Sequence, residues 1–255
     1  MSNQDTELYA NISVGHENDW ECIKSRIIAA AQCNADAIVL SKSTPHLAIQ
    51  PNKQYVKIDS KWGTLPYIDV AIKSEVDELT CHKIMRLIED IGIPIIWSVT
   101  DCTAAEWIKR ITGTDTIKVH YDSRDDLSLV TFVADSFQYI TYGGNDELID
   151  YLLKRLVKPK FKKRVKLLHS ANKFPPTIEE LNLDVLEAYK SRPHVRVGYE
   201  GRCEGLFPDC AVVFKNIDFI EKFLGDEESD NPAVLSHKEF YDFFINMNQL
   251  EIANG

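Results

Sequence analysis

The feature that most constrains the fold is an alternation, repeated eight times along the chain, of a short apolar run and a segment with helical signals. Several of the runs are continuously apolar, as expected of strands that are buried on both faces of a parallel sheet. We predict strands at 8–14, 37–40, 93–97, 116–120, 139–141, 165–169, 194–199 and 218–223. Because eight strands joined by right-handed helical crossovers close into a barrel, we expect an α/β fold, a single (β/α)8 TIM barrel domain over residues 1–255.

Two of the intervening segments give specific helix predictions. A capping-box pattern at 74–77 predicts a helix over 74–90, and one helix is predicted over 178–191. A long connection that contains several prolines and a glycine precedes the first of these helices. It is longer than a simple turn. Connections of that length are usually functional, so we expect an excursion near the site.

Charge and composition exclude several classes of protein. The net charge is −10, which argues against a nucleic-acid partner because binding to phosphates needs a basic face. No apolar run approaches the roughly 20 residues that span a bilayer, and the polar, acidic amino terminus resembles no signal peptide. The six cysteines form no CxxC pair, so reduced thiols are expected. We therefore expect a cytoplasmic protein without a membrane or nucleic-acid partner.

The carboxyl ends of barrel strands meet at one edge, where a site forms. His16, His120 and His169 each end or follow a predicted strand, and histidines in such places form metal sites in other proteins. No spacing enforces their convergence, so whether they form a metal site stays open. Gly143 and Gly144, ahead of a predicted helix, fit either a phosphate cradle or a tight turn.

One family combines these elements in the same order. The matching motifs are Leu167-Leu168-His169 with Asn172 and Pro175, then Asn182-Leu183, Val197-Gly198-Tyr199, Ile220-Glu221-Lys222 and, earlier, Ile117-Lys118-Val119. Through these motifs, and over nearly its whole length, the chain resembles the sialic acid synthase (N-acetylneuraminate synthase) family. The resemblance implies a (β/α)8 barrel that condenses phosphoenolpyruvate with an N-acetylated aminosugar, with manganese activating the sugar aldehyde.

The resemblance also implies roles for individual residues. Lys118 falls on the family's phosphoenolpyruvate-binding lysine, and Ser98 and Thr141 fall on hydroxyl residues that touch the same ligand. Asn172 matches an asparagine of some members, and Glu221 matches directly.

Other positions depart from the family pattern. Asn11 stands where the family has its catalytic glutamate, and Val39 where it has a lysine. Arg202 and Phe223 replace the two metal-binding histidines, so the resemblance implies loss of the manganese site and its Lewis acid. The antifreeze-like domain that follows the barrel in family members, and completes the partner's site in a dimer, is expected to be absent.

We therefore expect a divergent sialic acid synthase-like protein of nonulosonic acid or surface-polysaccharide biosynthesis. It would not run the standard metal-dependent condensation, would need no cofactor, and would bind an anion such as phosphoenolpyruvate or a phosphosugar, a second copy, or a partner synthase. No catalytic residue is assigned; the expected ligand-binding residues are Ser98, Lys118, Thr141, His169, Asn172, Arg202 and Glu221.

Three alternatives stay open. The chain could be an active synthase with an altered site, in which other residues hold the metal or Arg202 supplies its charge. It could be a pure protein-interaction module. Arg202 could also pair only with Glu200, Glu204 or Glu221 and seal the pocket.

Overall fold

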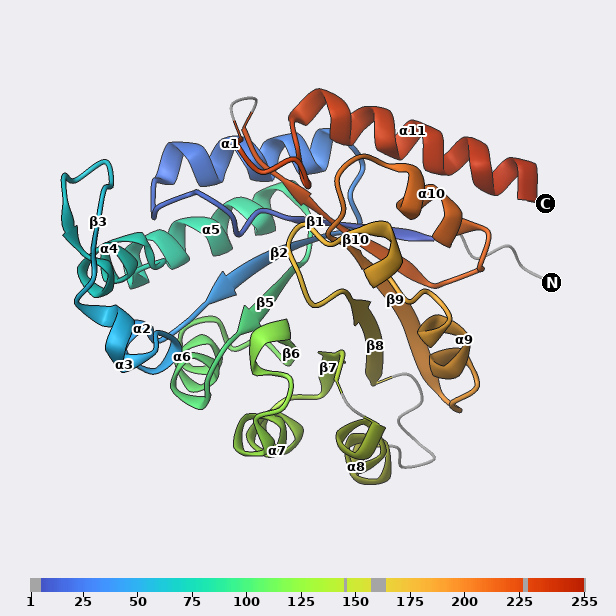
Figure 1. Ribbon diagram of the computed structural model, residues 1–255, viewed down its shortest axis with the longest axis horizontal. Coiled ribbons are helices and arrows are strands. Elements are labelled where there is room, and N and C mark those ends of the chain that lie inside the picture. Colours follow the sequence, from blue (N-terminus) through green and yellow to red (C-terminus); the bar gives the residue numbers. More distant parts are fainter. Residues whose placement is uncertain (1–5, 145, 157–163, 227–228, 255) are drawn as a thin grey trace.

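The computed structural model of the protein describes residues 6–144, 146–156, 164–226 and 229–254. Eight parallel strands form a closed barrel (Figure 1), which confirms the predicted fold. Closure occurs where the first and last of these strands pair over five registered positions, from Glu7↔Phe219 to Asn11↔Phe223. The strands are β1 (Glu7–Asn11), β2 (Ala37–Lys42), β5 (Ile95–Val99), β6 (Thr116–Val119), β7 (Tyr139–Tyr142), β8 (Val165–Ser170), β9 (Val195–Gly201) and β10 (Phe219–Leu224). A two-residue strand, β11 (Val234–Leu235), adds to β10 in parallel.

Helices cover the outside of the barrel (Figure 1). They are α1 (Trp20–Gln32), α5 (Glu78–Ile91), α6 (Cys102–Thr112), α7 (Leu127–Ser136), α8 (Asp146–Leu156), α9 (Val185–Lys190), α10 (Phe207–Val213) and α11 (His237–Asn254). The main core, which includes Ile27 of α1, Ile108 of α6 and Ile117 of β6, is completely buried at these positions. Within the described part of the chain, no helix combines the length and apolar character that a bilayer crossing requires.

The barrel interior is filled by alternate residues of each strand. Near the amino-terminal end the filling is apolar: Tyr9 stacks on Phe219 with ring centroids 4.9 Å apart, in a small cluster with Val39, Ile96 and Leu168. Two residues further along β1 and β10, the inward positions hold Asn11 and Glu221. The interior therefore changes from apolar to charged toward the carboxyl ends of the strands.

The long connection after β2 folds into small elements of its own at one side of the barrel (Figure 1). They are α2 (Pro45–Ala48), α3 (Pro51–Gln54), α4 (Tyr67–Ser74) and an antiparallel pair, β3 (Lys57–Ile58) with β4 (Leu65–Pro66). At its base Lys42 Nζ lies 3.0 Å from Glu75 Oε2, and at its tip Lys61 Nζ lies 3.0 Å from Glu17 Oε2. Ion pairs thus hold the base and the tip of this connection to the rest of the barrel domain.

Two helix predictions were wrong in detail. The predicted capping box at 74–77 is not the start of α5, because Ser74 ends α4 and the side chain of Asp77 caps α5 by accepting from Thr80 N at 2.7 Å. The segment predicted as one helix over 178–191 is broken at Asn182, whose φ is +44°. The break leaves a 3-10 turn, η2 (Ile178–Glu180), ahead of the shorter α9.

Candidate functional site

A buried ionic group lies inside the barrel mouth. Lys118 Nζ, from β6, lies 2.6 Å from Glu221 Oε1 of β10 and 2.9 Å from Glu200 Oε1 of β9. The amide of Asn11, from β1, donates to the same Glu221 oxygen at 2.6 Å. All four residues are at most 4% exposed. We call these four residues the Lys118 cluster.

The strand register explains how the cluster forms. Glu200 and Glu221 are direct register partners on adjacent strands, so both carboxylates project inward side by side. Lys118 reaches them from the other wall of the barrel, where its own register partners are Ser98 of β5 and Thr141 of β7. The register and the ion pair therefore bring Ser98, Lys118, Thr141 and Glu221, four of the predicted ligand residues, to one region of the barrel interior.

The pKa values of the cluster follow from burial and from its uneven charge. Burial would lower the pKa of Lys118, but the charges of Glu200 and Glu221 outweigh burial and raise it. Burial would raise the pKa of Glu200, but Lys118 and Arg202 outweigh it, so this pKa falls well below its usual range. Burial, aided by the charge of Glu200 and opposed by Lys118, raises the pKa of Glu221 to about 7. Glu221 is therefore the carboxylate that takes up a proton first.

Two buried donors beside the cluster lack an acceptor within the described residues. The hydroxyl of Ser98, a residue 1% exposed, has no hydrogen-bond partner among them. Arg202 Nε is also buried and makes no hydrogen bond within that part of the chain, although it lies 3.7 Å from Glu200 Oε2. Unsatisfied buried donors are uncommon and indicate a place for a further acceptor.

Arg202 is held in an aromatic stack at the mouth. Its guanidinium carbon lies 5.1 Å from the ring centroids of both Tyr121 and Phe174, which is cation–π distance. Its Nη1 donates to Ala171 O at 3.0 Å. The ring of Phe223 packs against Phe174 with centroids 4.6 Å apart. Arg202 thus lies close to Glu200, as one of the predicted alternatives has it. Its contacts with Ala171, Tyr121 and Phe174 hold the guanidinium charge in place.

The three histidines are each tied to nearby backbone. His16 Nδ1 accepts from Asn18 N at 3.1 Å, and burial lowers the pKa of His16 to about 4. His120 Nδ1 accepts from Asp122 N at 3.3 Å; burial and Lys118 lower its pKa. His169 faces out of the barrel and donates from Nε2 to Leu181 O at 2.6 Å. Among the described residues, no group of three or more His, Cys, Asp or Glu side chains is placed to hold a metal ion.

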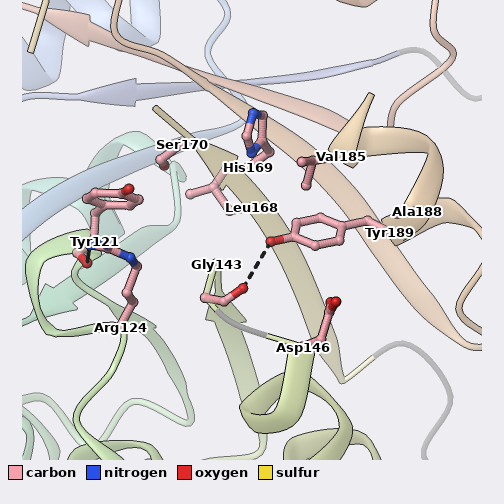
Figure 2. A pocket seen from close by; sticks show the side chains of 11 residues that line it. Tyr121, Arg124, Gly143, Asp146, Leu168, His169, Ser170, Val185, Ala188 and Tyr189 are labelled. Carbon is pink, nitrogen blue, oxygen red and sulfur yellow. Dashed lines mark hydrogen bonds between the residues drawn. The ribbon is translucent and has the colours of Figure 1, made fainter. Parts of the chain in front are cut away.

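A cavity of about 400 Å³ opens beside the cluster, lined by Tyr121 and Arg124, the β7–α8 turn, the end of β8 and Tyr189 of α9 (Figure 2). Ser170, in its wall, donates to Glu200 Oε2 at 2.5 Å. This hydrogen bond connects the wall of the cavity to the Lys118 cluster. Asn172, predicted as a ligand residue, accepts a hydrogen bond from the Tyr121 hydroxyl.

Gly143 and Gly144 line the same cavity, and close packing explains both. A Cβ at Gly143 would lie 1.8 Å from Leu168 O, and one at Gly144 would lie 2.0 Å from the Tyr142 hydroxyl oxygen. No larger residue fits either position without a shift of its neighbours. The turn therefore needs glycine whether or not an anion binds there.

Comparison with known proteins identifies the family. The model of the NeuB family matches residues 26–255. The chain belongs to the NeuB family. The predicted resemblance to sialic acid synthases is thereby confirmed, and the search among curated proteins gives no match.

Solved structures of the same fold are similar to this NeuB-family chain over nearly all of its length. An N-acetylneuraminic acid (sialic acid) synthetase from Leptospira borgpetersenii serovar Hardjo-bovis, in complex with citrate, has a TM-score of 0.83 at 17% identity, covering 98% of this chain and 85% of that one. The spore coat polysaccharide biosynthesis protein spsE from Bacillus subtilis has a TM-score of 0.77 at 17% identity, covering 97% and 68%. A truncated 3-deoxy-D-arabino-heptulosonate 7-phosphate synthase from Thermotoga maritima has a TM-score of 0.70 at 10% identity, covering 98% and 88%.

The residues at the expected manganese-ligand positions of this NeuB-family chain do not fit a metal. Arg202 brings a positive charge and no lone pair, and Phe223 brings only carbon atoms. Both side chains pack on Phe174, so the aromatic stack occupies the region.

Sequence reasoning missed the contact between Glu200 and Lys118. It considered Glu200 only as a partner of Arg202. The available signal was the two-residue period of a barrel strand, which places Gly198, Glu200 and Arg202 on the same inward face.

Proposed function

We propose that this NeuB-family barrel binds a small anion at the Lys118 cluster and does not run the metal-dependent condensation of phosphoenolpyruvate with an aminosugar. Its place would be in nonulosonic acid or surface-polysaccharide biosynthesis, in the cytoplasm, as one barrel domain over residues 1–255.

The loss of the condensation is supported by three positions. Asn11 cannot exchange a proton at neutral pH, and its amide donates to Glu221. Arg202 and Phe223 offer no metal ligand. A site without either the Lewis acid or the acid/base group lacks the main sources of rate enhancement for this addition.

The observation that carries anion binding is the pair of buried donors without acceptors in the described structure. Ser98 is the register partner of Lys118, and Arg202 and Lys118 both contact Glu200, so each donor belongs to a residue next to a member of the Lys118 cluster. Leaving a buried donor unsatisfied costs about 1–3 kcal/mol. An oxyanion would supply acceptors to both, and Arg202 offers the planar donors that suit carboxylate and phosphate. The Leptospira synthetase was solved in complex with citrate, which is also an anion.

Titration calorimetry with sulfate, phosphate and phosphoenolpyruvate tests the proposal. We expect saturable binding below about 1 mM that weakens about tenfold or more in Arg202→Ala, since a charge-assisted hydrogen bond contributes roughly 1.5–3 kcal/mol. Arg110→Ala, which removes an exposed arginine of α6, is the matched control and should bind as the wild type does. Absence of saturable binding at millimolar anion, or equal binding by both variants, would refute the anion site in favour of a partner-binding role.

A second assay tests the loss of catalysis. Phosphoenolpyruvate, N-acetylmannosamine and manganese are incubated with the protein, and release of inorganic phosphate is measured. We expect none above the rate without protein. Release that depends on manganese would refute the proposed loss and favour an active synthase with an altered site.

A further inference from the structure

Glu200 and Glu221 compete for one lysine, and their other contacts are unequal. Glu200 also accepts from Ser170 at 2.5 Å and lies 3.7 Å from the Arg202 guanidinium. Glu221 has, besides Lys118, only the neutral amide of Asn11 as a hydrogen-bond donor in the described structure. One carboxylate is therefore near two cations and the other near a single shared cation.

Adding an anion to this chamber changes its charge balance. Lys118 and Arg202 bring two positive charges, and the two carboxylates, when ionised, cancel them. A bound anion would then be a third negative charge in a buried space, where charges interact strongly. Neutralising one carboxylate restores the balance, and Glu221 is the one with less positive charge beside it.

We propose that an anion binds at the Lys118 cluster together with one proton, and that Glu221 takes up that proton. The proposal rests on the proposed anion-binding function and adds its regulation by pH. The proton comes from solvent and converts the Glu221 carboxylate to a carboxylic acid. Lys118 is thereby released from one of its two ion pairs, and the anion takes the place of the lost charge. The groups that face Glu221 are Lys118 from β6, Glu200 from β9 and Asn11 from β1.

The thermodynamic linkage between anion binding and protonation of Glu221 sets how strongly the affinity depends on pH. Because binding and protonation favour each other, affinity falls as pH rises, by up to about tenfold per pH unit once Glu221 is ionised in the free protein. The raised pKa of Glu221, about 7, places this loss of affinity at neutral to mildly alkaline pH.

The experiment is titration calorimetry of the full chain with sodium sulfate at pH 6, 7 and 8, in buffers of different ionisation enthalpy. Sulfate is the probe because it does not titrate in this range, so any proton taken up goes to the protein. We expect weaker binding at each higher pH, and an uptake per sulfate that approaches one proton at pH 8. Glu221→Gln, which mimics the protonated acid, should bind sulfate with an affinity independent of pH and with no uptake.

His120→Asn is the matched control, because His120 is another titratable group near Lys118, its pKa lowered by burial and by that lysine, and asparagine can still cap the turn. It should keep the proton uptake. Uptake that disappears in His120→Asn but persists in Glu221→Gln overturns the assignment to Glu221. Sulfate binding by the wild type without uptake at any pH overturns this inference and leaves the proposed function standing. No sulfate binding at any pH overturns both.

Discussion

Lys118 is the position at which a single substitution should be most informative about the charged interior. Lys118→Met keeps much of the volume of the side chain and removes the cation that contacts both Glu200 and Glu221. Removing one partner of a buried ion pair costs about 3–5 kcal/mol, because the remaining charge stays desolvated. We expect a loss of this size in the free energy of unfolding at pH 8. For a chain of this length it corresponds to a fall of about 6–20 °C in melting temperature.

Urea denaturation at pH 8, with the slope m checked for constancy, measures the loss. Lys109→Met, which removes a half-exposed lysine paired with Asp115, is the matched control and should cost at most about 1 kcal/mol. Adding Glu221→Gln to Lys118→Met should recover much of the stability, because Glu200 keeps Arg202 as its partner and no second carboxylate is left without a cation. A loss below about 1 kcal/mol in Lys118→Met alone would refute the reasoning.

Three further predictions concern neighbouring positions. Ser98→Ala should leave the free energy of unfolding unchanged or slightly higher, since it deletes an unsatisfied donor. The affinity for sulfate, measured by calorimetry, should fall severalfold. A clear loss of stability would show that the hydroxyl is already hydrogen-bonded. Gly201→Ala should destabilise the fold by about 2–4 kcal/mol in urea denaturation, because its Cβ would lie 1.8 Å from the Asp209 oxygen beside Lys222; an unchanged midpoint would contradict this. In the wild type, the raised pKa of Glu221 means that the folded chain holds a proton which the unfolded chain has lost, so this group's contribution to stability falls as pH rises from its ordinary 4.5 to about 7. Chemical denaturation across that range should show the fall, and Glu221→Gln should remove it; identical pH profiles would exclude Glu221 as the source.

The fold could be predicted because each strand is a compact apolar run and each run is followed by a helix. The same pattern places residues near the carboxyl ends of neighbouring strands in one chamber, and Ser98, Lys118 and Thr141 followed that rule. Their proximity needs only strand order and the usual register of a parallel barrel.

Other features of the site depend on which positions of a strand face inward and on contacts between residues far apart in the sequence. A short stretch of sequence does not determine either. β8 ends at Ser170, one residue beyond the predicted end at His169. The inward-facing positions of β8 are Lys166, Leu168 and Ser170, so the imidazole of His169 faces α9 and the loop before it. The approach of Lys118 to carboxylates on the opposite wall depends on the barrel diameter, and the stacking of Arg202 depends on two separate loops. The break at Asn182 likewise depends on tertiary packing, because the local sequence is compatible with a continuous helix.

The pairing of β1 with β10 has a consequence for synthesis of the chain. β1 leaves the ribosome before every other strand of the barrel, and its partner over five registered positions begins only at Phe219. Until that strand is available, one edge of β1 and one edge of β9 have no barrel neighbour, and unpaired strand edges promote aggregation. A nascent or truncated chain that ends before Phe219 therefore presents two open edges, and the order of translation makes chaperone protection most important just before the last barrel strand emerges.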